Sequence, residues 1–269
     1  MAITGLDGVI AGILPPYAFL KVGGTMEAAG VMHSMAYSTG LPGAMSAPSS
    51  GLSGSAITSR SGLVSVPAPA GANLSYLAGV DAAASVAGQL IIVDRLWDNS
   101  GAVVTTTTGQ TITSATWPAR DRDGSTNGEY VMVGIEVSTA TTNAGAVANT
   151  TITYTNSGGT GSRTGTISSF PATAVAGTFV PFQLAAGDTG VRSIQTLTLG
   201  TSYGAGAIHL VAYRELARVS LPIANIGSNL DAIATRLARL YDYTTISLLW
   251  LPSATTATTI AGNIVFTQG

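Results

Sequence analysis

The chain has 269 residues, a net charge of −2, only 9% charged residues and no cysteine. Because soluble domains are typically about 25% charged, we expect a surface that is covered by other subunits rather than one that stays free in solution. The absence of cysteine excludes disulfides, thiolate metal sites and thiol nucleophiles, and the absence of clustered Lys and Arg argues against a nucleic-acid partner. A β-rich secreted domain with a Thr-rich surface is the alternative interpretation of this composition.

The first region, residues 1–75, is rich in Gly, Ala, Ser, Pro and Met, and neither helical nor strand periodicity persists in it. Thr4 and Asp7 resemble a capping box, which predicts a short helix over residues 6–14. The remainder carries many apolar side chains, so it is not typical of a disordered segment. We predict an extended irregular N-terminal arm that lies in a groove, on its own subunit or on a neighbour, and is ordered only in the assembly.

The apolar N-terminus predicts neither a secretion signal nor a membrane segment. Residues 1–10 contain Asp7 and no Lys or Arg, so the positive region of a signal peptide is missing. The apolar run of residues 9–20 is interrupted by Pro15 and Pro16 and is too short to cross a bilayer. We expect the protein to be made in a bacterial cytoplasm and to remain soluble until it meets its partners.

The second region, residues 76–221, has the pattern of short β-strands. Val131, Val133 and Ile135 alternate with less apolar residues, which predicts a strand with one buried face. Turn signals separate the strands at the spacing of a β-sandwich or jelly roll. Trp97 and Trp117 are expected to be interior or interface anchors. The predicted strands cover residues 89–97, 130–137, 150–155, 163–168, 179–184, 191–199 and 207–213.

The third region, residues 222–269, predicts one helix followed by two strands. Apolar residues recur at helical spacing over residues 229–240, after a capping Ser228 or Asn229. Strands are expected at residues 244–251 and 258–266, packed on the body or on a neighbouring subunit.

No residue pattern points to catalysis, to a cofactor or to a metal. His33 and His209 lie far apart in the sequence, outside any ligand-spaced motif, and are expected to be structural. Asp94 and Asp98 are candidates for an acid pair of a glycan hydrolase by default alone.

One loop shows partial resemblance to a calcium site. Its oxygen-bearing residues recur at every second position, but Thr126 replaces the required Gly and Met132 the required Glu. The loop also contains two Arg residues, so we expect Arg–Asp pairing, within the loop or between subunits, rather than a cation. The ligand candidates are Asp121, Asp123, Ser125 and Asn127.

Four blocks of sequence resemble a family of phage-encoded structural proteins. They are residues 94–101 (DRLWDNSG), 117–128 (WPARDRDGSTNG), 190–195 (GVRSIQ) and 209–214 (HLVAYR), and the resemblance covers about residues 33–220. The genes of that family lie among virion structural genes of tailed bacteriophages. The resemblance implies a virion component and no catalytic residues.

Composition and resemblance together predict a structural virion protein on the exterior of the capsid. We expect it to bind the major capsid protein, to bridge neighbouring capsid subunits as a decoration or cement protein, and to self-associate as a homotrimer. A tail, neck or fibre-anchoring subunit is the alternative, and a virion-associated enzyme is a third class that lacks a convincing acid pair or nucleophile.

Overall fold

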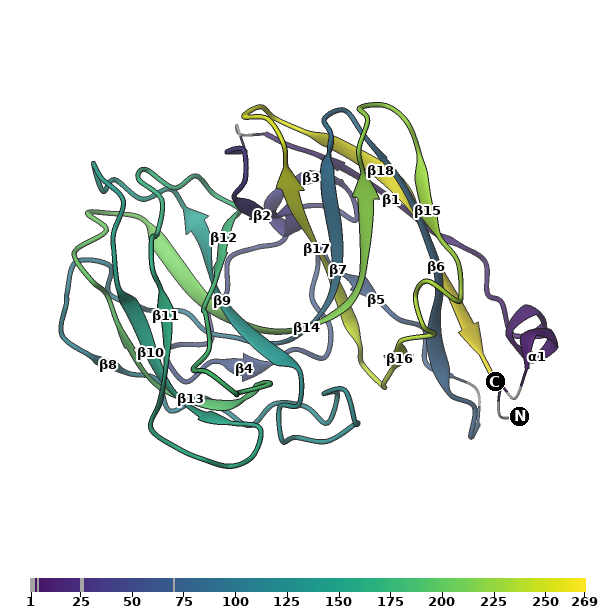
Figure 1. Cartoon of the computed structure of the whole chain (residues 1–269), viewed down its shortest axis with the longest axis horizontal. Coiled ribbons are helices and arrows are strands. Elements are labelled where there is room, and N and C mark those ends of the chain that lie inside the picture. The colour runs from purple at the N-terminus through teal and green to yellow at the C-terminus, as the bar shows by residue number, and fades with distance from the viewer. Residues whose placement is uncertain (1–2, 4, 25–26, 70) are drawn as a thin grey trace. The chain divides into compact units, whose positions relative to one another are not determined.

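The computed structural model describes residues 3, 5–24, 27–69 and 71–269 and is mainly β (Figure 1). The chain divides into two compact units. Unit 1 comprises residues 1–45, 58–94 and 215–269, and unit 2 comprises residues 46–57 and 95–214. The expected mainly β, sandwich-like body is confirmed.

One layer of unit 1 is an antiparallel sheet in which the last strand of the chain is central. Strand β18 (Thr259–Gln268) pairs with β6 (Ser75–Ala84) on one side and with β1 (Tyr17–Val22) on the other (Figure 1). The flanking strands are β3 (Thr39–Leu41) beside β1, and β15 (Ser228–Leu230) and β16 (Arg239–Leu240) beside β6. We call this sheet the terminal sheet.

The other layer of unit 1 is organised around β17 (Thr245–Pro252). This strand pairs with β2 (Met32–Ser34), with β5 (Val64–Ser65) and with the first part of β7 (Gly88–Asp98). A buried apolar cluster joins the two layers. It contains Phe19, Leu77, Val80, Ile260 and Ile264 from the terminal sheet and Leu90, Ile92, Leu248 and Trp250 from the other layer. Two short helices complete the unit, α1 (Leu6–Ala11) and the 3-10 helix η1 (Met35–Tyr37).

Unit 2 has its own sheet and its own core. Its sheet has the order β11 (Arg163–Ile167), β10 (Thr150–Asn156), β13 (Val191–Thr198) and β8 (Gln110–Thr111). Alternate residues of this sheet enter the core, where they meet side chains of β9 (Val131–Thr139). Beside β9 lie β12 (Thr178–Pro181) and the first part of β14 (Ala207–Leu221), and the last part of β7 pairs with β4 (Ser55–Ala56).

The two predicted tryptophan anchors are interior residues of unit 2. Trp97 and Trp117 are both buried, with ring centroids 5.1 Å apart. The indole of Trp97 donates to the carbonyl of Ser53, and that of Trp117 donates to the carbonyl of Val191. Both polar indole groups are therefore satisfied inside the fold, as buried Trp requires.

Threonines occupy the outward face of the sheet in unit 2. Thr153 lies opposite Thr164 on one neighbouring strand and Thr196 on the other, and Thr151 lies between Thr166 and Thr198. The inward positions of the same strands are apolar, so the strict alternation of period two places all the hydroxyls on one side. These threonine positions contribute hydroxyl groups and no charge to the surface.

The predicted helix over residues 229–240 was wrong. Residues 228–230 and 239–240 are strands, and the segment between them is a turn. The Asp231 carboxylate accepts from the backbone N–H groups of Ile233 and Ala234, which completes one turn. Arg236 and Leu237 then adopt left-handed backbone (φ 53° and 46°), which ends helical geometry. The apolar residues do recur at helical spacing, but Ile233, in the middle of the segment, is 84% exposed. Burial of its side chain therefore does not stabilise a helix here.

The division at residues 75 and 221 also differs from the two units. Strand β1 lies inside the terminal sheet of its own chain, so residues 17–22 form a regular strand and not part of an irregular arm. The predicted helix near the N-terminus is present as α1, with Gly5 at the N-cap and no side-chain cap; the proposed cap Thr4 lies outside the described residues.

Candidate interaction surface

Asp94 and Asp98, the acid pair considered for catalysis, are buried and bound to other groups of the protein. Asp94, in unit 1, accepts from the backbone N–H of Thr245 and from the hydroxyl of Thr244. Asp98, in unit 2, pairs with Arg95 at 2.8 Å. Both side chains are completely shielded from solvent. They hold backbone and guanidinium groups in place, and neither faces a cleft open to a glycan.

Arg95 is the centre of a buried ionic cluster that the sequence did not reveal. Its guanidinium binds both carboxylate oxygens of Glu136, at 2.8 and 2.7 Å, while its Nε donates to Asp98 at 2.9 Å. Arg120, also buried, donates to the backbone carbonyl of Arg95. Glu136 stood out in the sequence only as a charged residue in an otherwise apolar strand, and its partner lies 41 positions away.

The candidate calcium loop is closed around its own carboxylate. Asp121 Oδ1 accepts from the N–H groups of Asp123 and Ser125, and Oδ2 accepts from the Ser125 hydroxyl and the N–H of Glu129. Although burial acts to raise the pKa of Asp121, these hydrogen bonds outweigh it and lower the pKa below its ordinary value. Because donors surround the carboxylate, the arrangement is that of a structural turn and not of a cation site.

The rest of that loop pairs with itself. Arg122 binds Asp123 at 2.9 Å, and its guanidinium lies over the ring of Tyr130, 4.4 Å from the centroid. This is the Arg–Asp pairing expected within the loop. The side chain of Asn127 has no role in it. Among the described residues, no group of three or more His, Asp or Glu side chains is placed to hold a metal ion.

The two histidines have structural partners in separate units. His209 Nδ1 lies 2.8 Å from the carbonyl of Asn99, and Nε2 lies 2.7 Å from the Ser138 hydroxyl. His33 Nε2 accepts from the N–H of Ala28 at 2.9 Å. Burial lowers the pKa of His33 to about 4, so this ring is neutral at physiological pH.

Burial removes much of the already small ionic surface. Of the 24 charged residues, nine are buried, and the remaining 15 are spread over 10793 Å² of accessible surface. In unit 2 exposed charges also pair locally, as in Arg122 with Asp123 at 2.9 Å. The surface therefore carries fewer charged groups than the composition alone indicates.

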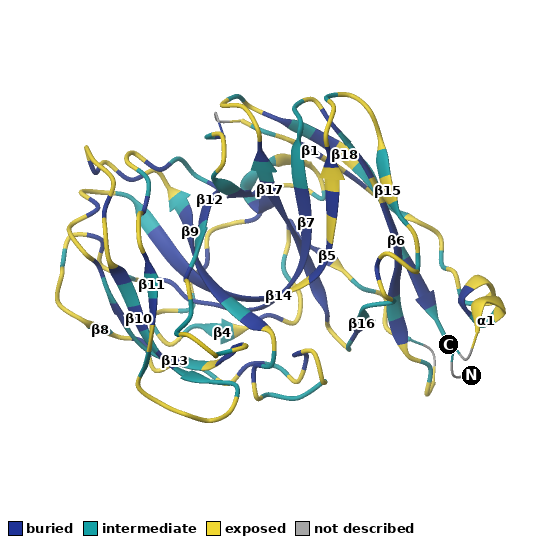
Figure 2. Cartoon of the chain, viewed as in Figure 1, coloured by how far each residue is buried: buried dark blue, intermediate teal, exposed yellow. Residues whose placement is uncertain are grey.

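Exposed apolar side chains gather on unit 1. Of the 13 large apolar side chains exposed among the described residues, 11 belong to this unit. Leu20 and Val22 point outward from β1, and Leu41 lies directly opposite Leu20 on β3. Helix α1 adds Leu6 and Ile10 and is exposed over most of its length (Figure 2).

The outward face of the terminal sheet continues this surface with small, mostly uncharged residues. Ala18 and Ala261 are exposed on β1 and β18, and Asp81 is the exposed acid of β6. A shallow hollow of about 400 Å³ lies over β6, β15 and β18, lined by Asp81, Asn229, Ala261 and five neighbours. We call the outward face of β1, β3 and β18 with helix α1 the apolar face.

Comparison of the chain with protein-family models, with curated proteins and with solved structures gives no match. Among the described residues, no helix has the length and apolar character needed to cross a membrane.

Proposed function

We propose that the chain is a structural virion protein of a tailed bacteriophage that binds the capsid exterior and stabilises the shell by bridging major capsid subunits. The observation that carries the proposal is the apolar face, an exposed sheet surface with large apolar side chains and almost no charge. An exposed apolar patch of this kind marks a protein contact. The four blocks that resemble phage structural proteins support the placement in a virion.

The proposed action is binding rather than catalysis. Pressure from packaged DNA pulls capsid subunits apart, and a protein bound across two of them must lose its contacts before they separate. At about 25 cal/mol per Å² of apolar area, an interface of about 800 Å² per partner supplies a gross stabilisation of several kcal/mol. Many copies, and self-association into trimers, make the contacts mutually reinforcing.

Copy number in the purified virion tests the placement. Quantitative mass spectrometry against the major capsid protein should give hundreds of copies per particle. A count of six or twelve would contradict the shell proposal and favour a tail or neck subunit.

Introducing charge on the apolar face tests whether this face binds the capsid. Leu20→Asp combined with Val22→Asp places two carboxylates on the apolar face, where desolvation opposes docking. We expect this variant to fold and to lose its binding to particles that lack the protein. Thr164→Asp is the matched control, because Thr164 is an exposed strand position on the sheet of unit 2. Equal binding by both variants would contradict the role of the apolar face.

A further inference from the structure

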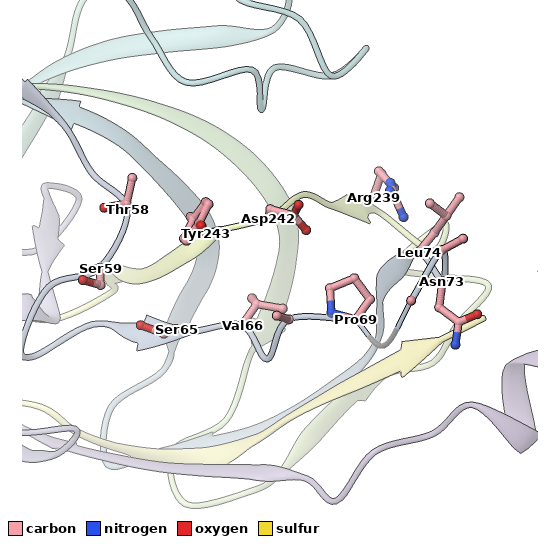
Figure 3. A pocket seen from close by; sticks show the side chains of 13 residues that line it. Thr58, Ser59, Ser65, Val66, Pro69, Asn73, Leu74, Arg239, Asp242 and Tyr243 are labelled. Atoms are coloured by element: carbon pink, nitrogen blue, oxygen red, sulfur yellow. The ribbon is translucent and has the colours of Figure 1, made fainter.

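Unit 1 also contains a pocket of about 570 Å³. Its volume lies within the range of small-molecule sites. Thr58 and Ser59 lie at one end and Asn73, Leu74 and Arg239 at the other, with Tyr243 and Asp242 along one side and Ser65, Val66 and Pro69 along the opposite side (Figure 3). The pocket is therefore elongated, with polar groups at both ends.

Tyr243 is the unusual residue of this pocket. Its backbone has φ 64°, a left-handed conformation that is strained for a bulky residue. The turn that holds it is closed by the N–H of Thr244 bonding to the carbonyl of Tyr241. Gly or Asn would fit this position without strain, yet it carries an aromatic ring that is 69% exposed. The ring of Tyr243 therefore offers an exposed aromatic surface in the lining of the pocket.

The polar groups around the ring are available to a ligand. The hydroxyls of Thr58, Ser59 and Ser65 have no hydrogen-bond partner within the described part of the chain, and neither has the carboxylate of Asp242. The guanidinium of Arg239, in contrast, is already held. It lies 5.3 Å from the ring centroids of both Tyr76 and Tyr241 and donates to the carbonyl of Ser75.

These features favour a neutral polyhydroxylated ligand. The charges of Asp242 and Arg239, the acid and the base of the pocket, balance. The guanidinium of Arg239 is already held by two tyrosine rings and a backbone carbonyl, so the pocket does not favour an anion. A carboxylate accepts from two vicinal hydroxyls, Ser and Thr hydroxyls both donate and accept, and an exposed ring packs against the C–H face of a sugar. We propose that this pocket binds a neutral oligosaccharide, with Tyr243 as the stacking platform and Asp242 as the main acceptor.

Binding of defined sugars tests the inference. Saturation-transfer NMR and titration calorimetry would use the full chain with lactose, maltotriose, cellotriose and chitotriose, and with inorganic phosphate as an anionic probe. We expect saturable binding of at least one sugar and no binding of phosphate. Asp242→Asn and Tyr243→Gly should each weaken that binding at least about tenfold, the loss of one strong hydrogen bond or stacking contact.

The controls separate binding from folding. Tyr243→Gly removes the ring and also relieves the strained backbone, so this variant stays folded. Tyr130→Ala is the matched control, because Tyr130 is an exposed tyrosine with φ 58° that lies in unit 2, and it should leave the affinity unchanged. The inference is overturned if no sugar shows saturable binding, if phosphate is preferred, or if Tyr130→Ala weakens binding as much as Tyr243→Gly. Particle binding through the apolar face is measured separately. The sugar site and the proposed function can therefore each be contradicted without the other.

Discussion

At the scale of single residues, the ionic cluster of Arg95 shows a charged side chain that is buried and paired with carboxylates. The guanidinium is bidentate to Glu136 and fully buried. Removing one member of a buried pair leaves the other charge desolvated and unpaired, which is strongly destabilising.

We therefore expect Glu136→Gln to lower the free energy of unfolding by about 3–5 kcal/mol in chemical denaturation. Asp123→Asn is the matched control. It breaks an Arg–Asp pair whose side chains are 52% and 58% exposed, and exposed pairs contribute about 1 kcal/mol or less. Similar losses in both variants would show that the buried cluster is not a principal support of unit 2.

The strained turn at Tyr243 gives a second prediction. Because φ is positive there, Tyr243→Gly should be more stable than Tyr243→Ala by about 1 kcal/mol, in reverse of the usual order. Thermal denaturation of the two variants measures the difference. The same pair of substitutions at Thr164, in a regular strand, should show Ala above Gly; the same order at both positions would contradict a left-handed Tyr243.

The histidines predict acid sensitivity. Burial lowers the pKa of His33 to about 4, so the unfolded chain binds this proton more readily than the folded chain between about pH 6.5 and 4. Stability from this group is complete above pH 6.5 and is lost as the pH falls toward 4, by at most about 3 kcal/mol. His209, whose pKa burial also lowers, acts in the same direction.

Denaturation midpoints across this pH window measure the effect. In His33→Gln the loss of stability on acidification should be clearly smaller than in the unmodified chain. An unchanged pH profile in this variant would contradict a buried, neutral His33.

At the scale of elements, the terminal sheet joins the two ends of the chain. Phe19 of β1 is buried in the core of unit 1, and the whole of β1 is in register with β18. Limited proteolysis of the isolated protein should therefore leave β1, residues 17–22, intact, with early cuts before Tyr17. Early loss of the first 75 residues, seen by intact-mass analysis, would restore the interpretation of an arm that orders only on a partner.

Strands with strict alternation were predicted from the sequence with small errors at their ends. Residues 131–137 have apolar residues at alternate positions and form β9, and the strand predicted over residues 191–199 is present as β13, where register shifts against β10 interrupt the alternation. Strand β6 was missed because its sequence, SYLAGVDAAA, is rich in Ala and Gly, which have low strand propensity. Its partner β18 is far away in the sequence, so only tertiary pairing makes it a strand.

The sites were harder to predict than the strands. The sequence singled out Asp94, Asp98 and Asp121, and burial or local hydrogen bonds engage all three. The apolar face and the pocket combine segments that are distant in the sequence, such as residues 58–74 and 239–243. The small number of exposed charges, in contrast, could be predicted from the composition, which needs no knowledge of which segments meet.

At the scale of the whole molecule, the small number of exposed charges predicts association that is insensitive to salt. Coulombic contacts between exposed groups weaken as ionic strength rises, whereas apolar burial does not. Raising sodium chloride from about 50 to 500 mM should change the affinity for capsids less than about threefold, by surface plasmon resonance or co-sedimentation. A steep decline with salt would indicate that the contact depends on the few exposed Arg and Asp residues rather than on the apolar face.

The position of β18 in the terminal sheet also sets an order of events during synthesis. Every residue of unit 2 has been added once Arg214 leaves the ribosome, and that unit can then close its core. Unit 1 closes later, because the strand between β1 and β6 is made of residues 259–268, which follow every other strand of that unit in the sequence. Strand β1, although it is translated early, has no partner on that side until residues 259–264 have been made. A nascent chain stalled before residue 259 would hold a finished unit 2 and an open unit 1.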